Sequence, residues 1–417
     1  MTETTATATP QITETVDEFA ARAAVWLAAN MPRLDPDNLP EVDRGAEGPW
    51  LRARELQKKL YAGGFAGICF PREYGGLGLP IAYQKAFDEV SREYELPIIL
   101  NTPTFTICAA TLLDTGSEQQ KQTRISAAIR GDEVLVQLLS EPSGGSDLAG
   151  VITRADHRDG KWIINGAKTW STSAFAADYG LMLARTNWDV PKHEGLTMFL
   201  VPINSPGITM RRIRQVDGSD EFCEEFFDDL VLDEDAVVGA VNDGWAVASR
   251  QMHHERRAVG GGSEFSSGIG SEGISDRVVD YPALLAKVGD TEHNRLLAGR
   301  ALVRRAVQEQ LIEHVYHGTL DGSLPAAAGS IIRVGHAEAI QFEMDTTLAL
   351  TGSDGLIDSG DGLFPLTARY LSRQQASLGG GTCEIARNVI GERILGFPRE
   401  FAADRGVPFN QVKRKRD

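Results

Sequence analysis

The chain has 417 residues, of which 42% are hydrophobic and 24% are charged, and its formal net charge at pH 7 is -16. A chain of this length can form two or three domains, each with its own core. The strong negative charge argues against a general nucleic-acid binder, because phosphate backbones attract basic surfaces. The short basic stretch at 413–416 is interpreted as a solvated terminus.

The four cysteines are scattered and form no CxxC pair. Cys69, Cys108, Cys223 and Cys383 therefore predict neither a disulfide framework nor a zinc site, and we expect no metal. The first fifteen residues are polar and lack the apolar segment of a secretory signal. No uninterrupted apolar run approaches the ~20 residues that a membrane-spanning helix needs. We expect a cytoplasmic protein without a membrane span.

The first part of the chain carries a helical pattern. Apolar residues recur at spacings of three and four, as at Val16, Phe19 and Ala23. A loop rich in Gly and Pro at 71–80 separates two of the expected helices. The pattern predicts an all-α domain over residues 1–130.

The pattern changes at Gly131, where short β-type runs with turn signals between them begin. The pairs Asp159-Gly160 and Asn165-Gly166 are typical of tight hairpins. We expect a middle β domain over 131–240, built as a compact barrel or sandwich. The expected strands span 134–139, 161–164, 180–184, 197–201, 208–213 and, as a final pair, 222–232.

The third part of the chain, 241–417, is expected to be helical. Asp243-Gly244 predicts the start of a long helix that ends near Val259. The segment 260–276, rich in Gly and Ser, is either a flexible surface linker or a mobile wall beside a substrate cavity. Further helices are expected at 281–287, 292–317, 325–350 and 382–395.

Three segments stand out in chain order: LSEPSGGSD (139–147), NGAKTWST (165–172) and SLGGGTCEIARN (377–388). The last is a glycine run that opens a helix, where backbone N–H groups can approach a ligand closely. Together and in this order, the segments resemble the flavin-dependent acyl-CoA dehydrogenase family over about 74–399. The resemblance implies an α+β fold with an N-terminal all-α domain, a middle β-barrel domain and a C-terminal helical bundle.

The resemblance also implies FAD as the cofactor, lying against the β domain. Ser140 would offer a hydroxyl to the ring edge, Trp170 an aromatic face and Thr172 a hydroxyl near N5. The alternative is that Trp170 is a core anchor and Ser140 an ordinary strand hydroxyl. The implied cofactor-binding residues are Gln137, Leu139, Ser140, Gly145, Ser146, Trp170, Ser171, Thr172, Gly352, Gly355, Thr382 and Glu384, of which the two glycines at 352 and 355 belong to a turn that reaches a neighbouring subunit's FAD.

Removal of an α-proton from an acyl thioester requires a carboxylate opposite the flavin. In the commonest branch of the family this Glu occupies the position that is Gly380 here, which has no side chain. The second family position, on the long helix, matches Glu255. Its helix neighbours are largely small or apolar, so we expect a poorly solvated carboxylate with a raised pKa. The alternative is an exposed Glu255 that pairs with Arg256 or another helix neighbour.

Gly380 keeps its backbone N–H, which the resemblance assigns to polarising the thioester carbonyl. Ser146, Met252 and Arg256 are the implied substrate contacts. The two adjacent histidines, His253 and His254, point to different sides of a helix and are weaker candidates for the site.

One family feature is missing. Many members carry an Arg-x-x-Phe-Gly segment whose Arg meets the FAD pyrophosphate across the subunit interface, and this chain has none. Either another basic residue substitutes, or the pyrophosphate is held differently, or the subunit does not complete its own FAD site. The nearest basic residues are Arg295, Arg300, Arg304 and Arg305.

Three hypotheses follow. The first is an acyl-CoA dehydrogenase that passes electrons to an electron-transfer flavoprotein and assembles as a tetramer. The second is an acyl-CoA oxidase or flavin monooxygenase of the same fold. The third is a subunit of a heteromeric dehydrogenase that shares FAD sites with a related chain. The sequence does not specify whether the acyl group is straight, branched or ring-bearing.

Overall fold

The computed structural model describes residues 14–35, 42–259, 263–269 and 279–412. Its N-terminal part is helical, as the periodicity predicts. The first helix begins at a capping box, in which the Thr15 side chain accepts from the Glu18 N–H and the Glu18 carboxylate accepts from the Thr15 N–H. Its buried face carries Phe19, Ala23 and Leu27. The α-helices here are α1 (Val16–Asn30), α2 (Glu47–Ala62), α3 (Ile81–Ser91), α4 (Ala110–Thr115), α5 (Glu118–Gln120) and α6 (Ser126–Arg130).

One stretch of this part, Ile98–Thr115, is long and apolar enough by composition to cross a bilayer. Within the described residues it is the one stretch that passes this test, and 78% of it is buried inside the protein. Such burial is what the core helix of a globular domain shows.

The middle part of the chain forms one eight-stranded mixed sheet in the order β6-β7-β3-β2-β4-β5-β8, with β1 paired to β4. Within the described residues β6 and β8 do not pair, so the sheet is an open path and not a closed ring of strands. Its two halves are joined by a single residue pair between β2 and β4. The strands are β1 (Leu135–Leu138), β2 (Arg154–Arg158), β3 (Lys161–Thr172), β4 (Tyr179–Arg185), β5 (Leu196–Pro202), β6 (Ile208–Ile213), β7 (Phe222–Asp233) and β8 (Val237–Val238).

Two strand predictions were wrong. The strand expected at 161–164 continues to Thr172, because Asn165-Gly166 forms a bulge in the β3–β7 ladder and not a hairpin turn. The run at 222–232 is a single long strand and not a strand pair. The sequence analysis also missed the strands β2 and β8, which are short or strongly polar.

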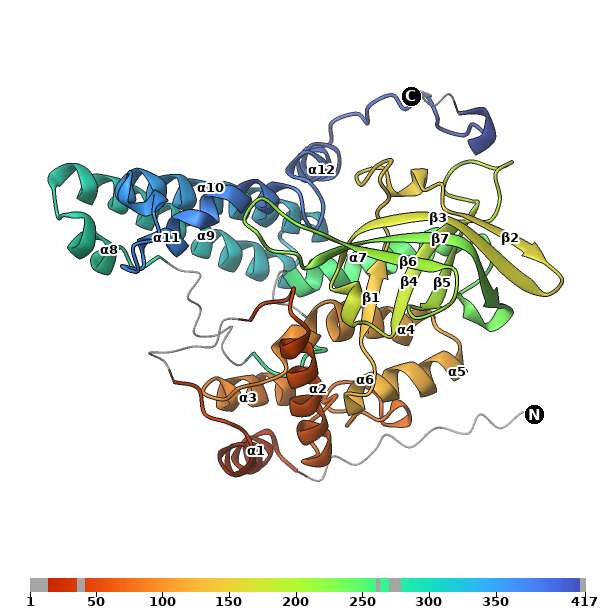
Figure 1. Ribbon diagram of the computed structural model, residues 1–417, viewed down its shortest axis with the longest axis horizontal. Helices are drawn as coiled ribbons and strands as arrows, with labels where there is room; N and C mark the ends of the chain where they lie inside the picture. The colour runs from red at the N-terminus through yellow and green to blue at the C-terminus, as the bar shows by residue number, and fades with distance from the viewer. Residues whose placement is uncertain (1–13, 36–41, 260–262, 270–278, 413–417) are drawn as a thin grey trace.

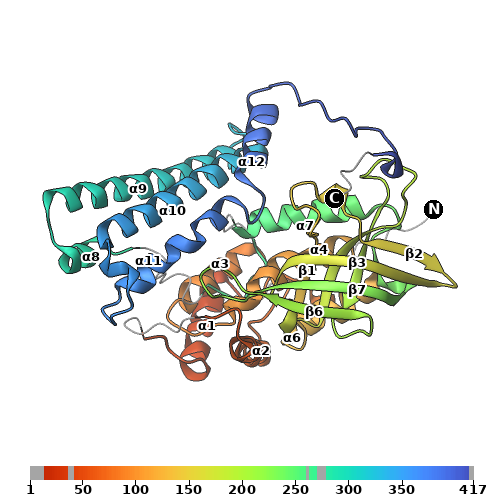
Figure 2. The ribbon, with the colours of Figure 1, turned by 45° about the horizontal axis from the view of Figure 1, so that its top comes forward.

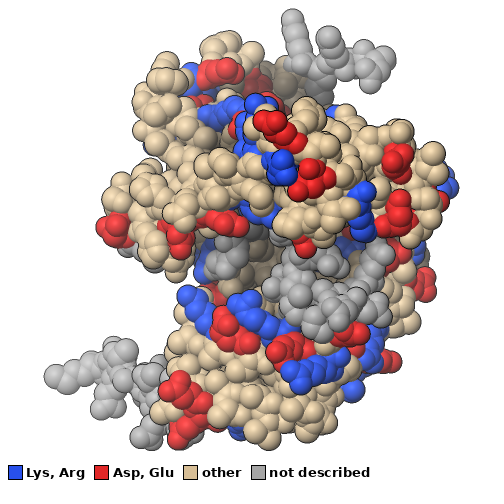
Figure 3. Space-filling model, turned by 90° about the vertical axis from the view of Figure 1, so that its left-hand side faces the viewer, with Lys and Arg blue, Asp and Glu red and all other residues tan. Residues whose placement is uncertain are grey.

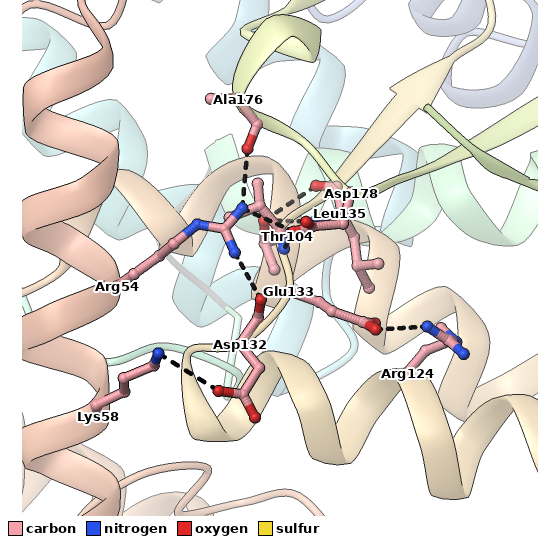
Figure 4. A network of polar contacts seen from close by, with 10 residues as sticks. Arg54, Lys58, Thr104, Arg124, Asp132, Glu133, Leu135, Ala176 and Asp178 are labelled. Carbon is pink, nitrogen blue, oxygen red and sulfur yellow. Dashed lines mark hydrogen bonds and ion pairs between the residues drawn. The ribbon is translucent and has the colours of Figure 1, made fainter. Parts of the chain in front are cut away.

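A polar network joins the N-terminal helices to the sheet (Figure 4). The Arg54 guanidinium on α2 donates to the Ala176 carbonyl at 3.0 Å and to the Asp178 carboxylate at 2.7 Å. The Thr104 hydroxyl donates to the Leu135 carbonyl at 3.0 Å at the start of β1. These bonds place β1 against the helices.

The C-terminal part is helical and has its own small core. In both ribbon views α8 to α11 lie side by side and extend away from the sheet (Figures 1 and 2). A hollow separates these helices from the N-terminal helices, and charged side chains of both signs line its border (Figure 3). The helices are α7 (Gly244–Val259), α8 (Tyr281–Val288), α9 (Glu292–Leu320), α10 (Gly329–Thr351), α11 (Leu363–Ser372) and α12 (Cys383–Val389).

The Gly- and Ser-rich segment is described only at 263–269; its residues 260–262 and 270–276 lie outside the described part. The described piece is docked on the N-terminal domain. The Phe265 ring lies 4.4 Å from the Phe70 ring, and the Ser267 hydroxyl donates to Gln57 at 2.8 Å. For these seven residues, a free linker does not describe the arrangement.

Candidate active site

The long helix α7 brings Glu255 next to the loop of three glycines at 379–381, called here the glycine loop. A Cβ atom placed on Gly380 would lie 3.7 Å from the Glu255 Oε1 atom. The two alternative positions for the base therefore converge on one point, although 125 residues separate them in the chain. The Gln137 amide on β1 donates to the Glu255 Oε2 atom at 3.4 Å. Glu255 is held between β1 and the glycine loop.

The environment of Glu255 matches a general base. Burial raises the pKa of the Glu255 carboxyl, while the Gln137 amide and the Arg256 guanidinium oppose this shift without cancelling it. No ion pair joins Glu255 to Arg256 within the described residues, so the alternative of an exposed, paired Glu255 was wrong. Met252, one turn earlier, packs against the main core. Part of the Arg256 side chain is buried, and this, together with the nearby Arg393, lowers its pKa.

The glycine loop is fixed by a residue that the sequence analysis did not single out. The Arg333 guanidinium on α10 donates to the carbonyls of Ala376 at 2.5 Å, Gly379 at 2.7 Å and Gly381 at 3.1 Å. Gly380 has a φ of 71°, which favours glycine. Within the described part of the chain, no protein acceptor takes the Gly380 N–H. The loop therefore presents a free donor beside Glu255.

The two segments predicted to bind flavin lie together. The Thr169 N–H donates to the Ser140 carbonyl at 3.0 Å, and the buried Lys168 ammonium donates to the Leu139 carbonyl at 3.0 Å. Lys168 also pairs with Glu141 at 2.9 Å, and both side chains are almost fully buried. This contact joins the first segment, on the loop after β1, to the second segment, on β3.

Trp170 is turned outward by a bulge. The β3–β7 ladder shifts register between Thr169 and Ser171, Trp170 has a φ of 63°, and its side chain is 56% exposed. Within the chain its ring meets the Phe222 ring edge-on at 5.7 Å. The alternative of Trp170 as a core anchor was wrong. Ser171 points inward instead and donates to the buried Glu225 at 2.9 Å.

The remaining predicted cofactor residues lie at two separate places. The Thr382 hydroxyl caps α12 by accepting the Ile385 N–H, and Glu384 is exposed one residue into the helix. The turn with Gly352 and Gly355 follows the C-terminal end of α10, about 28 Å along the helix axis from Arg333, which holds the glycine loop. Gly355 is buried, and a Cβ atom there would lie 2.3 Å from the Thr367 hydroxyl. Packing within the chain thus requires this glycine.

The loop that carries Gly145 and Ser146 is exposed, and a Cβ atom on Gly145 would meet nothing within 4 Å. The end of the loop is held by Lys192, which pairs with Asp147 at 2.8 Å and with Asp404 at 2.7 Å. Asp404 belongs to a C-terminal segment that runs from α12 across to the sheet (Figures 1 and 2).

That segment is anchored by Phe409, which is 3% exposed and lies under the buried Arg185 guanidinium at 3.3 Å. Arg185 in turn donates to the carbonyls of Ala149 at 2.6 Å and Val151 at 3.0 Å. Sequence patterns offer no signal for these contacts, because the partners are far apart in the chain.

Three of the four arginines considered as substitutes for the missing pyrophosphate Arg already contact other side chains of this chain. Arg305 donates to Glu343 at 2.8 Å, Arg295 pairs with Asp290 at 3.1 Å, and Arg304 lies over the Phe342 ring at 4.6 Å. Arg300 lies on the exposed side of α9. A group of three or more His, Cys, Asp or Glu side chains that could hold a metal ion does not occur in the described residues.

The chain matches the N-terminal domain description of acyl-CoA dehydrogenase over 11–132, the middle domain over 137–230 and the C-terminal domain over 242–395. It is 32% identical to the acyl-CoA dehydrogenase IpdE1 of Mycobacterium tuberculosis over 395 residues, which cover 92% of this chain and 98% of that protein. The chain therefore belongs to the acyl-CoA dehydrogenase family, whose members are oxidoreductases that act on acyl-CoA.

Solved structures show the same three-part architecture. The Tcur3481-Tcur3483 steroid ACAD has a TM-score of 0.71 at 26% identity and covers 92% of this chain and 98% of its own. The ChsE4-ChsE5 complex from Mycobacterium tuberculosis has a TM-score of 0.65 at 20% identity and covers 94% of this chain and 100% of its own. The predicted α–β–α fold class is confirmed.

Proposed function

We propose that this chain is an FAD-dependent acyl-CoA dehydrogenase that forms a 2,3-enoyl thioester, with Glu255 as the base for the α-proton. The observation that carries the proposal is the convergence of Glu255 Oε1 on the Cβ position of Gly380 at 3.7 Å. A carboxylate could reach this point from position 255 or from position 380. In this chain it comes from Glu255, and Gly380 leaves the glycine loop without a side chain.

The described residues fit FAD. Trp170 presents an exposed aromatic face from a bulge that turns it out of the sheet, and Ser140 and Thr172 lie partly exposed on the neighbouring strand ends. Gly379, Gly380 and Gly381 carry no side chains. Among the described residues, the one atom within 4 Å of a Cβ added on Gly380 is Glu255 Oε1. When bound, FAD supplies the acceptor for the β-hydride.

The chain's own residues perform the proton chemistry. The Glu255 carboxylate takes the α-proton and becomes a carboxylic acid, while the electron pair of the broken C–H bond moves into the new double bond. The Gly380 N–H, which no protein acceptor takes within the described residues, donates to the thioester oxygen as negative charge develops there. The raised pKa of Glu255 brings it closer to the pH at which it works.

The substrate proposed first for testing is a ring-bearing acyl-CoA. The support is the similarity to a solved steroid ACAD, Tcur3481-Tcur3483, at 26% identity. We propose an electron-transfer flavoprotein as the electron acceptor; an acyl-CoA oxidase of the same fold would instead return its electrons to oxygen.

We expect the purified protein to be yellow, with about one FAD per chain or per pair of chains, and to lose its flavin absorbance when an acyl-CoA substrate is added without oxygen. A panel of straight, branched and steroid-ring thioesters, assayed with a dye acceptor, ranks the substrates. Rapid recovery of the absorbance on admission of air, without a dye or an electron-transfer flavoprotein, would identify an oxidase. A colourless protein that takes up no FAD, alone or with a related chain, would contradict the proposal.

We further propose that the chain works as an oligomer, with a related chain as partner. The exposed side of α9 carries Leu296, Val303 and Val307, which are 55%, 63% and 61% exposed, with Arg300 among them. The three apolar residues are spaced by seven and four positions, which places them in one stripe on the helix. The absence of the Arg-x-x-Phe-Gly segment favours a partner that supplies the missing pyrophosphate contact. The similar Tcur3481-Tcur3483 steroid ACAD, which carries two protein names, agrees with this arrangement.

Light scattering should therefore find a dimer or a tetramer, and Val303→Asp with Val307→Asp should shift the protein toward the monomer, because each places a charge in the apolar stripe. Glu309→Lys, an exposed change on the same helix outside the stripe, serves as the control. An active, FAD-replete monomer at assay concentration would contradict the oligomer. A homo-oligomer that binds a full complement of FAD would contradict the heteromer alone.

A further inference from the structure

Three ionisable side chains are buried directly behind the segment that carries Trp170. Glu141 is 3% exposed, and Lys168 and Glu225 are 0% exposed. Glu141 accepts from the Ile152 N–H at 2.6 Å, from the Thr153 N–H at 2.9 Å and from the Lys168 ammonium at 2.9 Å. Glu225 on β7 is the cross-strand partner of Lys168 on β3.

The charges in this cluster do not balance if both carboxylates are ionised. Lys168 and Glu141 already form a buried pair in direct contact, so the cluster holds no second cation for Glu225. Glu225 has one hydrogen bond, from the Ser171 hydroxyl to Oε2, and its buried Oε1 atom has no partner. A buried carboxylate with one free oxygen is costly, and the neutral acid removes that cost.

The groups around Glu225 agree with the neutral form. Burial raises the pKa of Glu225 to about 8, with Ser171 and Lys168 opposing the shift and Glu224 adding to it. Cys223, on the same buried side of β7, is a thiol whose own pKa burial raises to about 11. On β6, the Arg211 and Arg212 guanidiniums lie over the Phe226 and Phe175 rings.

The bulge at Trp170 is what brings Ser171 to Glu225. In the β3–β7 register, Lys168 lies opposite Glu225 and Ser171 lies opposite Cys223. The one extra residue in β3 between these two positions lets both Lys168 and Ser171 face the buried side. The Ser171–Glu225 bond therefore closes the bulge on its inner side. Trp170, the extra residue, is turned to the outer side with a positive φ.

We propose that Glu225 is a proton-linked positioning residue: as a neutral acid it lets the strands pack closely around Ser171 and the outward-turned Trp170, and its ionisation with rising pH leaves a buried charge with one unpartnered oxygen, which loosens this flavin-binding bulge. The inference about the flavin rests on the proposed function. The inference that Glu225 is protonated rests on the buried cluster alone.

The first test measures thermal unfolding of the full-length protein between pH 5 and pH 10 for the wild type, Glu225→Gln and the matched control Glu224→Gln. An acid with a raised pKa in the folded state contributes stability at low pH that is lost as pH rises through its folded pKa. The melting temperature of Glu225→Gln relative to wild type should therefore rise from pH 5 to about pH 8 and then stay level. A difference independent of pH over this range would overturn the proposal. If Glu225→Gln does not fold, Glu225→Met takes its place.

The second test measures FAD dissociation and the visible absorbance of bound FAD over the same pH range. In the wild type and in Glu224→Gln, the dissociation constant should increase by about fivefold over the first pH unit beyond the midpoint, as expected for a single titrating group. Glu225→Gln should show no such step. A step retained in Glu225→Gln would overturn the role of Glu225. Failure of every variant to bind FAD would contradict the proposed function and the link to the flavin, and the unfolding curves would still decide the protonation state.

Discussion

Glu255→Gln should lower the turnover of the best acyl-CoA substrate by about 10²–10⁴-fold, the usual range for loss of a general base. The amide has nearly the shape of the carboxylate and still meets Gln137 and the glycine loop, so the fold and FAD content should not change. Only the ability to accept the α-proton is lost. Single-turnover flavin reduction is the measurement to use, because it reports the proton and hydride transfer without product release.

His253→Gln, an exposed change two residues earlier on the same helix, is the control and should leave turnover unchanged. Turnover of Glu255→Gln within a factor of two of wild type would show that Glu255 is not the general base. In the wild type, the logarithm of kcat/KM should rise with pH until Glu255 is ionised, with a midpoint above 4.5, because only the carboxylate is a base and burial raises the pKa.

The geometry also predicts a partial rescue. Gly380→Glu in the Glu255→Gln background places a carboxylate at the same point, since the Cβ position is 3.7 Å from Oε1 of the residue it replaces. The rescue should be incomplete, because a non-glycine residue at a φ of 71° is strained by about 1–2 kcal/mol. No recovery in a folded, FAD-bound double variant would indicate that the two positions do not reach the same α-carbon.

Lys168→Met should destabilise the protein by about 3–5 kcal/mol, because it leaves the buried Glu141 without its cation. Burial works against the ionised form of Glu141, but Lys168 and two backbone N–H groups together hold the pKa of this carboxyl below its usual value. Burial lowers the pKa of Lys168 and Glu141 opposes that shift. The pair is ionic at neutral pH, since Glu141 accepts three hydrogen bonds.

The loss in Lys168→Met should depend on pH. In the wild type, the lowered pKa of Glu141 contributes stability above the unfolded pKa near 4.5, and this contribution is lost as pH falls. Without Lys168, the pKa of Glu141 should rise, so the variant should lose the most at neutral pH and above and recover toward pH 4–5. Urea unfolding midpoints at several pH values provide the measurement.

Two further variants separate charge from packing. Lys168→Met with Glu141→Gln removes the unpaired charge and should recover at least half of the lost stability. Lys161→Met, on the exposed end of the same strand, should hardly change the midpoint. Equal losses in the single and double variants would show that packing at position 168, and not the buried charge, decides the stability.

By itself the sequence determined the α–β–α order and the place of most helices, because apolar spacing and turn residues act locally. The buried face of α1 follows directly from Val16, Phe19 and Ala23. The motifs also pointed to Glu255 and Gly380 as the two candidate positions for the base. What they could not show is the distance between the two side-chain positions, since these lie 125 positions apart in the chain.

Only the tertiary structure decided the contacts that hold the site. The sequence predicted a short strand ending at Ile164, whereas pairing with β7 extends β3 to Thr172 and absorbs the glycine as a bulge. Three side chains gain their roles from partners on other elements. Arg333 binds Ala376, 43 positions away, Lys192 binds Asp404, 212 positions away, and Glu225 accepts from Ser171, 54 positions away. Local propensity carries no information on such pairs, because burial and charge balance are set by the elements that surround them.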